Sequence, residues 1–349
     1  MTQLVDTRNL FVSTESVTNG NSLDTTFFLP QGLMSCDESQ RMRLSLLTFS
    51  MRQNWYNINQ YNNRFYIVAT DLVGAILASS LVTIARGNYS SYDNSVFGLT
   101  VALETAMGTA LTAMGITGHN VAVVWDSVTG KLQMTYDASS QPTYTNIKHL
   151  AFTINNYTSS AGSLVQDIIG TNNVTAYQDV FEILGGCKNV KNDISVFSEL
   201  KDIFDTTFVA NAMTATSYWG ASLNTMENIY IRTNLNNTSF QSAGFDTGSS
   251  KYPDIVSSNI LAKIPIGNNN FAYQADTVRK MISQEQSKVI YYTDNGNNLF
   301  SMYLQTKQQT SMRLYVTDAY GRPLSIESPE QLSCNGMYWT ATMRIDVYG

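Results

Sequence analysis

Charged residues are scarce in this chain, which limits what its surface can bind. They make up 14% of its 349 residues, against roughly 25% in an average soluble protein. The net charge is -6 and no run of basic residues occurs, whereas nucleic-acid phosphates are bound by clustered Lys and Arg. We therefore expect no direct, sequence-specific binding of nucleic acid. A surface of Asn, Ser, Thr and Tyr suits faces that are buried in large assemblies, where charges are costly to desolvate. It equally suits extracellular and phage-tail β-proteins.

Cysteine and histidine are almost absent. The three cysteines, Cys36, Cys187 and Cys334, stand far apart without C-x-x-C spacing, which predicts buried, reduced thiols in place of disulfides or a metal site. Neither His119 nor His149 has a Cys, Asp or Glu at metal-ligand spacing, and no G-x-S-x-G motif accompanies them. The sequence therefore predicts no metal site, no cofactor and no nucleophilic triad.

Long apolar runs are missing as well. No stretch reaches the roughly 18 apolar residues of a membrane-spanning helix. The first residues lack the basic segment and apolar core of a secretion signal. We expect neither membrane insertion nor secretion to be encoded locally.

The last third of the chain ends in three runs in which apolar residues alternate with polar ones. These runs cover Lys288 to Thr293, Ser311 to Thr317 and Tyr338 to Tyr348, with a turn rich in Asp, Gly and Pro at Asp318 to Pro323. This period of two, bounded by turns, predicts antiparallel strands with one buried face, and so a β-sandwich. Because the last run reaches the end of the sequence, we expect the final residues to be hydrogen-bonded into a sheet.

Further strands are expected on both sides of the middle of the chain. Those at Thr25 to Pro30, Arg41 to Phe49 and Asn62 to Ala69 are predicted to form one antiparallel meander. Two more are expected at Asn228 to Thr233 and Asn259 to Ile266. About eight strands result, which predicts a mainly β fold: a single eight-stranded jelly roll of two packed sheets.

The character of the sequence changes at Asp71. Residues 72 to 84 are apolar without alternation, which fits either a buried strand pair or a short helix. Apolar residues three and four apart within Ser95 to Met114 predict an amphipathic helix. Short strands are expected after it, at Asn120 to Trp125, Lys131 to Tyr136 and His149 to Asn155. We therefore expect an α+β domain inserted into the jelly roll, with the chain divided into residues 1–70, 71–190 and 191–349.

Two local patterns allow other readings. The aromatic cluster near Trp55 fits a sugar-binding groove, but alternate positions along strands fit core on one side and subunit contact on the other. Asp246 to Gly248 matches the Asp-Thr-Gly signature of aspartic proteases, yet the second such loop that a carboxylate pair needs is absent. We therefore predict that the chain is not an enzyme. The residues that we select as subunit contacts are Trp55, Tyr56, Tyr61, Arg232 and Arg322.

Five segments together resemble a known family in order and spacing. The resemblance covers both ends of the chain and skips its middle. It is to the minor capsid or penton proteins of virophages, polinton-like viruses and related eukaryotic double-stranded DNA viruses. The segments are RLSLLTFSMRQNWYNIN (Arg43 to Asn59), NIYIRTNL (Asn228 to Leu235), NILAKIPI (Asn259 to Ile266), SMRLYVTDAYGRPLSI (Ser311 to Ile326) and WTATMRIDVYG (Trp339 to Gly349).

The resemblance implies a structural role in the virion. Its members carry a single vertical jelly roll that forms homopentamers at the icosahedral vertices and contacts trimers of the major capsid protein. The inserted domain faces outward, where another minor capsid protein or a host receptor is its expected partner. The implied location is the virion capsid, assembled inside the host cell. The alternative is a receptor- or carbohydrate-binding head of a viral fibre or baseplate, with its binding rim at residues 234 to 250 and 267 to 270.

Overall fold

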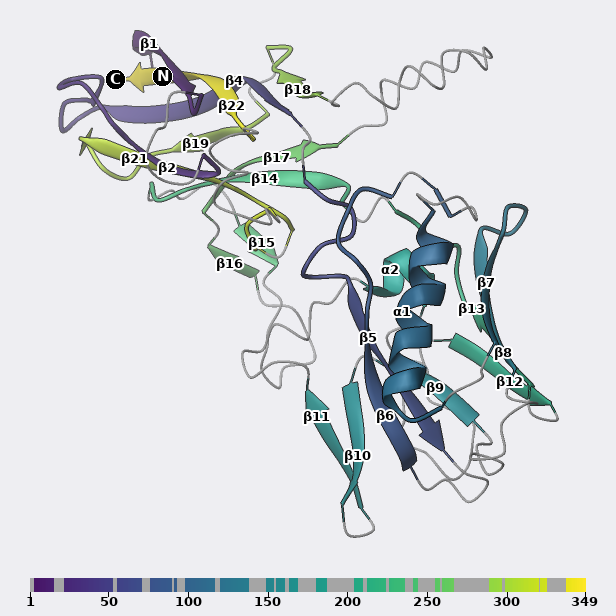
Figure 1. Ribbon diagram of the computed structural model, residues 1–349. Helices are drawn as coiled ribbons and strands as arrows, with labels where there is room; N and C mark the ends of the chain where they lie inside the picture. Colours follow the sequence, from purple (N-terminus) through teal and green to yellow (C-terminus); the bar gives the residue numbers. More distant parts are fainter. Residues whose placement is uncertain are drawn as a thin grey trace, which may run out of the picture. The chain divides into compact units, whose positions relative to one another are not determined.

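In the computed structural model, the chain is built mainly from antiparallel strands (Figure 1). It forms two compact units, Met1–Trp55 with Met226–Gly349, and Tyr56–Thr225. The structure describes residues 3–15, 22–52, 55–70, 76–89, 91–92, 98–116, 120–137, 149–153, 155–160, 163–168, 180–186, 204–209, 212–223, 226–235, 241–243, 255–257, 259–266, 289–296, 299–319, 321–324 and 337–349.

The first unit consists of two main antiparallel sheets. One is ordered β1 (Leu4–Ser13), β22 (Trp339–Tyr348), β4 (Arg41–Arg52) and β18 (Val289–Thr293), with β19 (Ser301–Tyr303) also paired to β4. The other is ordered β17 (Ile260–Pro265), β14 (Asn228–Thr233), β21 (Ser311–Thr317) and β2 (Asp24–Phe28). Short pairs flank them: β3 (Met34–Ser35) with β20 (Gln308–Gln309), and β15 (Gln241–Ala243) with β16 (Ile255–Ser257).

The strand order of the two main sheets is that of a jelly roll. When β18 and β19 are taken as one broken edge strand, eight strands follow one another along the chain. The first, eighth, third and sixth form one sheet, and the fifth, fourth, seventh and second form the other. This crossing between two four-stranded sheets defines the jelly roll. The predicted fold class is therefore confirmed.

Alternation along each strand builds the core between the sheets. On β22 the residues Trp339, Ala341 and Met343 are buried, while the threonines between them are half-buried. The Trp339 ring stacks on Phe49 at 5.9 Å and meets Phe27 edge-on at 6.0 Å between ring centres. Its indole N–H donates to the carbonyl of Ser22 at 2.7 Å, so the only polar atom of this buried side chain is satisfied.

The members of the jelly roll differ from the predicted ones in two places. Strand β1 was not predicted. Two of its inward positions hold the charged residues Asp6 and Arg8, so apolar and polar residues do not alternate regularly along it. The predicted strand at Asn62 to Ala69 is β5 (Arg64–Thr70), which pairs within the second unit. The predicted meander is wrong, since β2 pairs with β21 and β4 pairs with β22. Local patterns do not reveal partners that lie nearly 300 residues away.

The two ends of the described chain lie side by side in the first sheet, as Figure 1 shows. Leu4 lies opposite Tyr348, and the backbone N–H of Gly349 donates to the carbonyl of Gln3 at 2.9 Å. The final residues are therefore held in a sheet, as the sequence predicts.

The second unit combines two sheets with helices. One sheet is ordered β6 (Ile76–Thr83), β5 and β9 (His149–Thr153), and the other β12 (Phe204–Val209), β13 (Ala212–Ser217), β8 (Lys131–Asp137) and β7 (Asn120–Asp126). The predicted helix is α1 (Leu99–Ala113), which buries Leu103 and Met107 against this unit's own core. The remaining elements are a β10 (Asn155–Ser160) and β11 (Ser163–Ile168) hairpin and α2 (Val180–Leu184).

The units divide at different residues from the sequence-based boundaries. The observed division falls at Trp55 and Tyr56, and again at Thr225 and Met226, instead of after residues 70 and 190. The cause is strand pairing, because β5 joins β6 and β9, and β12 and β13 extend the hairpin of β7 and β8. Residues 72 to 84, which fitted a strand pair or a helix, contain the single strand β6 among those described.

A tight turn joins three elements of the second unit. Gly185, just after α2, has a φ of 66° and accepts a hydrogen bond at its carbonyl from the N–H of Trp219 at 2.9 Å. The N–H of Ala221 donates to the carbonyl of Gly130 at 2.7 Å, in the turn between β7 and β8. The Trp219 side chain nevertheless stays 66% exposed. The turn therefore presents this indole on a fixed backbone.

Candidate assembly surfaces

The described residues contain no group of three or more His, Cys, Asp or Glu side chains that could hold a metal ion. No helix in the described part of the chain is long and apolar enough to cross a membrane. Cys36 is a half-buried free thiol, and its pKa is raised mainly by burial. Asp246, His119, Cys187 and Cys334 lie outside the described residues. Two organised groups of polar side chains lie on the outer faces of the two jelly-roll sheets.

A continuous network crosses the outer face of the second sheet. Arg313 on β21 makes a two-pronged ion pair with Asp24 on β2, and its Nε lies 2.7 Å from Asp24 Oδ1. The guanidinium of Arg313 also lies over the ring of Tyr315, 5.1 Å from its centre. The hydroxyl of Tyr315 accepts a hydrogen bond from Asn259, which in turn accepts one from Arg232 on β14 at 2.8 Å. The network therefore connects β2, β21 and β14 and fixes planar side chains along the face.

Arg232 is held in this network by two hydrogen bonds. Its Nε donates to the hydroxyl of Thr317 at 2.9 Å, and its Nη1 donates to Asn259. The ring of Tyr230 lies 6.0 Å from the guanidinium carbon. A Cβ on Gly321 would lie 3.6 Å from Arg232 Nη2, so this turn lies beside the guanidinium. The arginine is held by neutral groups alone among the described residues.

A separate group of polar side chains lies on the outer face of the first sheet, around the carboxylate of Asp346 on β22. This side chain points to the outer face, yet only 3% of it is exposed. It accepts from Thr7 on β1 at 3.1 Å, from Arg43 Nη2 on β4 at 2.7 Å and from Arg344 Nε at 3.2 Å. Arg43 also lies 5.1 Å from the centre of the Tyr348 ring. Three strands are thus tied together on their outer surface by one buried carboxylate.

The environment of Asp346 makes part of the stability depend on pH. Burial raises its pKa, but the hydrogen bonds from Arg43 and Thr7 and the nearby positive charges outweigh burial, so the net pKa is below the ordinary value. Because the folded pKa is the lower one, stabilisation is complete above the unfolded value of about 3.9 and is lost as the pH falls through the folded value. We expect Asp346→Asn to lower the free energy of unfolding by about 1–2 kcal/mol at pH 7.

The difference between the wild type and Asp346→Asn should shrink on acidification from pH 7 to pH values below about 4. Denaturant unfolding of both proteins across that range measures it. A difference that stays constant down to the lowest pH would show that the carboxylate charge contributes nothing to folding.

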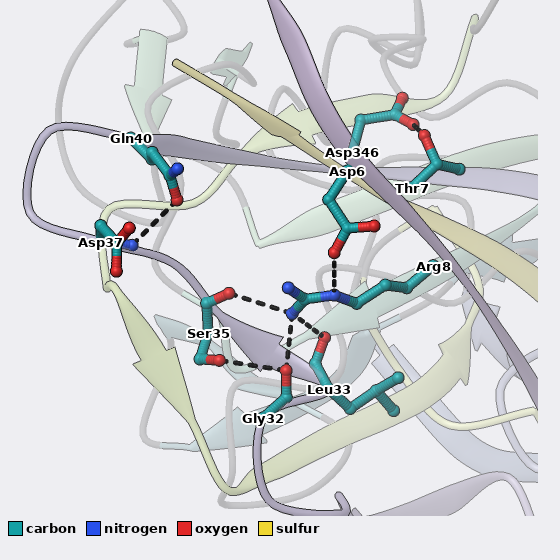
Figure 2. A network of polar contacts seen from close by, with 9 residues as sticks. All are labelled: Asp6, Thr7, Arg8, Gly32, Leu33, Ser35, Asp37, Gln40 and Asp346. Carbon is teal, nitrogen blue, oxygen red and sulfur yellow. Dashed lines mark hydrogen bonds and ion pairs between the residues drawn. The ribbon is translucent and has the colours of Figure 1, made fainter.

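The inner side of β1 carries a second polar cluster at one end of the sandwich (Figure 2). Arg8 Nη1 donates to the carbonyls of Gly32, Leu33 and Ser35 at 2.6, 3.0 and 3.0 Å, and its Nε pairs with Asp6 at 2.7 Å. This arginine holds the loop between β2 and β3 against the edge strand. An open pocket of about 410 Å³ lies beside it, lined by Val5, Asp6, Arg8, Ser35, Cys36, Asp37, Gln40 and Val347. The contacts of Arg8 with three backbone carbonyls and Asp6 make this cluster part of the framework of the jelly roll.

The residues selected from the sequence as subunit contacts fall into three places. Trp55 is 6% exposed and belongs to the jelly-roll core, so its own chain encloses it. Tyr56 and Tyr61 are half-buried and begin the second unit. Arg232 and Arg322 are brought together, because Arg322 pairs with Asp318 at 2.6 Å in the turn whose Gly321 lies against Arg232.

Other residues on these faces were not selected from the sequence. Arg313, Tyr315, Arg43 and Asp346 lie at outward positions of predicted strands and form the centres of the two networks. For Arg313 and Tyr315, the signal is that Arg and Tyr stand two residues apart on both β14 and β21. Such residue types are enriched where protein surfaces meet.

Comparison with known proteins gives distant likenesses. No family model matches the chain, and no curated protein matches its sequence. Two solved virophage structures align with nearly all of it. The penton protein of mavirus aligns over 98% of this chain and 100% of its own, with a TM-score of 0.46 and 10% identity. A chain in the structure of the Sputnik virophage aligns over 98% of both, with a TM-score of 0.39 and 13% identity.

Proposed function

We propose that the chain is a structural protein of a virion: a penton or minor capsid protein that forms pentamers at icosahedral vertices and contacts the major capsid protein. The observation that carries this proposal is the pair of outer faces, each covered by arginine, tyrosine and hydroxyl side chains that are fixed by mutual contacts. Side chains that are already ordered lose little conformational entropy when a neighbour covers them. The sequence resemblance of the strand segments supports the same role.

In a ring, each outer face of the jelly roll meets an unlike surface of a neighbouring copy. Copies related by rotation contact one another through unlike surfaces, and such a ring closes without an unsatisfied interface. Tyr56, Tyr61, Arg232 and Arg322 are the contacts that we propose from the original selection. The proposed location is the virion capsid, with assembly inside the host cell. Neither proposed role, in the ring or against the major capsid protein, needs a reaction centre or a cofactor.

The oligomeric state tests this proposal directly. We expect native mass measurement of the purified chain to show a fivefold oligomer of the 38.7 kDa protomer. Electron microscopy of virions should place this oligomer at the vertices. A chain that stays monomeric at all concentrations and occupies no vertex would remove the penton assignment.

A second candidate function is receptor or carbohydrate binding by the second unit. The observation that favours it is the fixed turn with Trp219 66% exposed, joined to the β7–β8 turn where Val128 is 91% exposed. Exposed aromatic rings stack on sugar faces and anchor protein contacts. The sequence-predicted binding rim at 234 to 250 and 267 to 270 lies mostly outside the described residues. A monomeric chain that binds glycans would support this alternative over the penton role.

A further inference from the structure

The two outer faces of the jelly roll have charges of the same sign. The first sheet presents Arg41, Arg43, Arg52 and Arg344 outward against the single carboxylate of Asp346. The second sheet presents Arg232, Arg313 and Lys263 against Asp24. Two surfaces that each carry an excess of cations repel one another when they are desolvated. The faces therefore do not neutralise each other, and each fits an acidic partner.

The net negative charge of the chain is concentrated in its other unit, which has few basic residues. Tyr56–Thr225 contains 12 acidic and 7 basic residues, a net charge of -5. The jelly-roll unit contains 15 acidic and 14 basic residues, a net charge of -1. The net charge of -6 thus comes almost entirely from the inserted unit. The inserted unit therefore carries the excess negative charge that the cationic jelly-roll faces fit.

Arg232 differs from the neighbouring arginines in how its charge is balanced. Arg313 pairs with Asp24, and Arg322 pairs with Asp318 at 2.6 Å. The side-chain partners of Arg232 within the described residues are Thr317 and Asn259, which are neutral. An arginine that is held in place without a carboxylate partner keeps a planar, positively charged guanidinium that can bind a carboxylate through two N–H groups. Lys263 is exposed and lies opposite Tyr230 in the strand register, so it adds positive charge beside this site.

We propose that Arg232, flanked by Tyr230 and Lys263, is the anchor at which a neighbouring copy docks a carboxylate from its acidic inserted unit. The inference rests on the proposed self-assembly and specifies one of its contacts. Fixed arginine and tyrosine side chains are typical of the residues that dominate binding between proteins. Complementary charge favours a defined orientation of the two copies and a fast encounter between them.

Zero-length cross-linking of the oligomer tests the contact. Carbodiimide joins an amine directly to a carboxylate in contact with it, so mixed unlabelled and ¹⁵N-labelled chains distinguish links between copies from links within one. We expect Lys263 to be linked to an Asp or Glu of Tyr56–Thr225 in a differently labelled copy. Links from Lys263 only to jelly-roll carboxylates, or no link between copies in an intact oligomer, would overturn the inference and leave the proposed function standing.

Substitution of the anchor gives an independent measurement. We expect Arg232→Gln to raise the dissociation constant between copies at least about tenfold. Arg232→Lys keeps the charge but loses the two-pronged geometry, so its effect should be intermediate. Arg86→Gln removes the same charge from an exposed position of the inserted unit and should leave the constant within about threefold. Equal effects of Arg232→Gln and Arg86→Gln would contradict the anchor role, while a monomeric wild type would overturn both this inference and the penton assignment.

Discussion

Replacing Trp339 by alanine should lower the free energy of unfolding of the jelly-roll unit by about 3–5 kcal/mol. Its side chain is 1% exposed and is the largest among those that are fully buried. Truncation removes its contacts with Phe49 and Phe27 and leaves a cavity between the sheets. It also leaves the carbonyl of Ser22 without the indole donor. Both losses add to the cost of the cavity itself.

The chain offers a matched control for this substitution. Trp219→Ala removes the same side chain from a position where 66% of it is exposed, so its cost should stay within about 0.5 kcal/mol. Denaturant unfolding followed by circular dichroism measures both variants against the wild type. Similar losses for the two tryptophans would show that Trp339 does not pack in the core as described.

Replacing Gly185 by alanine should lower the free energy of unfolding of the second unit by about 3 kcal/mol or more. An added Cβ would lie 2.2 Å from the carbonyl oxygen of Trp219 and 3.1 Å from the nitrogen of Ala221. Both neighbours are backbone atoms, so neither a rotamer change nor a small side-chain shift relieves the contact. The positive φ of 66° at this glycine adds a conformational cost for any residue with a side chain.

Gly296→Ala separates the two contributions. This glycine has a φ of 91°, but an added Cβ would meet no atom within 4 Å, so only the conformational cost of about 1–2 kcal/mol applies. Thermal or denaturant unfolding of the two variants gives the comparison. If Gly185→Ala costs no more than Gly296→Ala, the close packing of the turn against α2 is incorrect.

The sequence predicts the fold where alternation is regular and fails where polar residues point inward. The regular runs gave β14, β17, β21 and β22 in nearly their observed bounds, because a strand with one buried face shows its period directly. Strand β1 was not predicted because Arg8 occupies an inward position at the end of the sandwich. There its guanidinium donates to backbone carbonyls, whereas an apolar side chain would pack into the core.

The pairing of strands lay beyond what the sequence shows. In the sequence, Asp346 is one polar residue of an alternating strand. Only the pairing of β22 with β1 and β4 places it opposite Thr7 and Arg43. Arg232 was selected as a contact from the sequence, but its fixed position depends on Asn259 and on the turn at Gly321. Local patterns therefore predicted most of the strands, while the contacts among their outward residues depend on strands that are distant in the chain.

The adjacency of β1 and β22 determines when the protein can mature during translation. The second unit, Tyr56–Thr225, is complete as a segment of chain long before β22 has left the ribosome. Strand β1 has no partner in the first sheet until β22, which lies between β1 and β4, has been made. The carboxylate of Asp346 and the cationic outer surface around it arrive with that strand. A nascent copy consequently cannot present this surface before β22 has been made and has paired with β1 and β4.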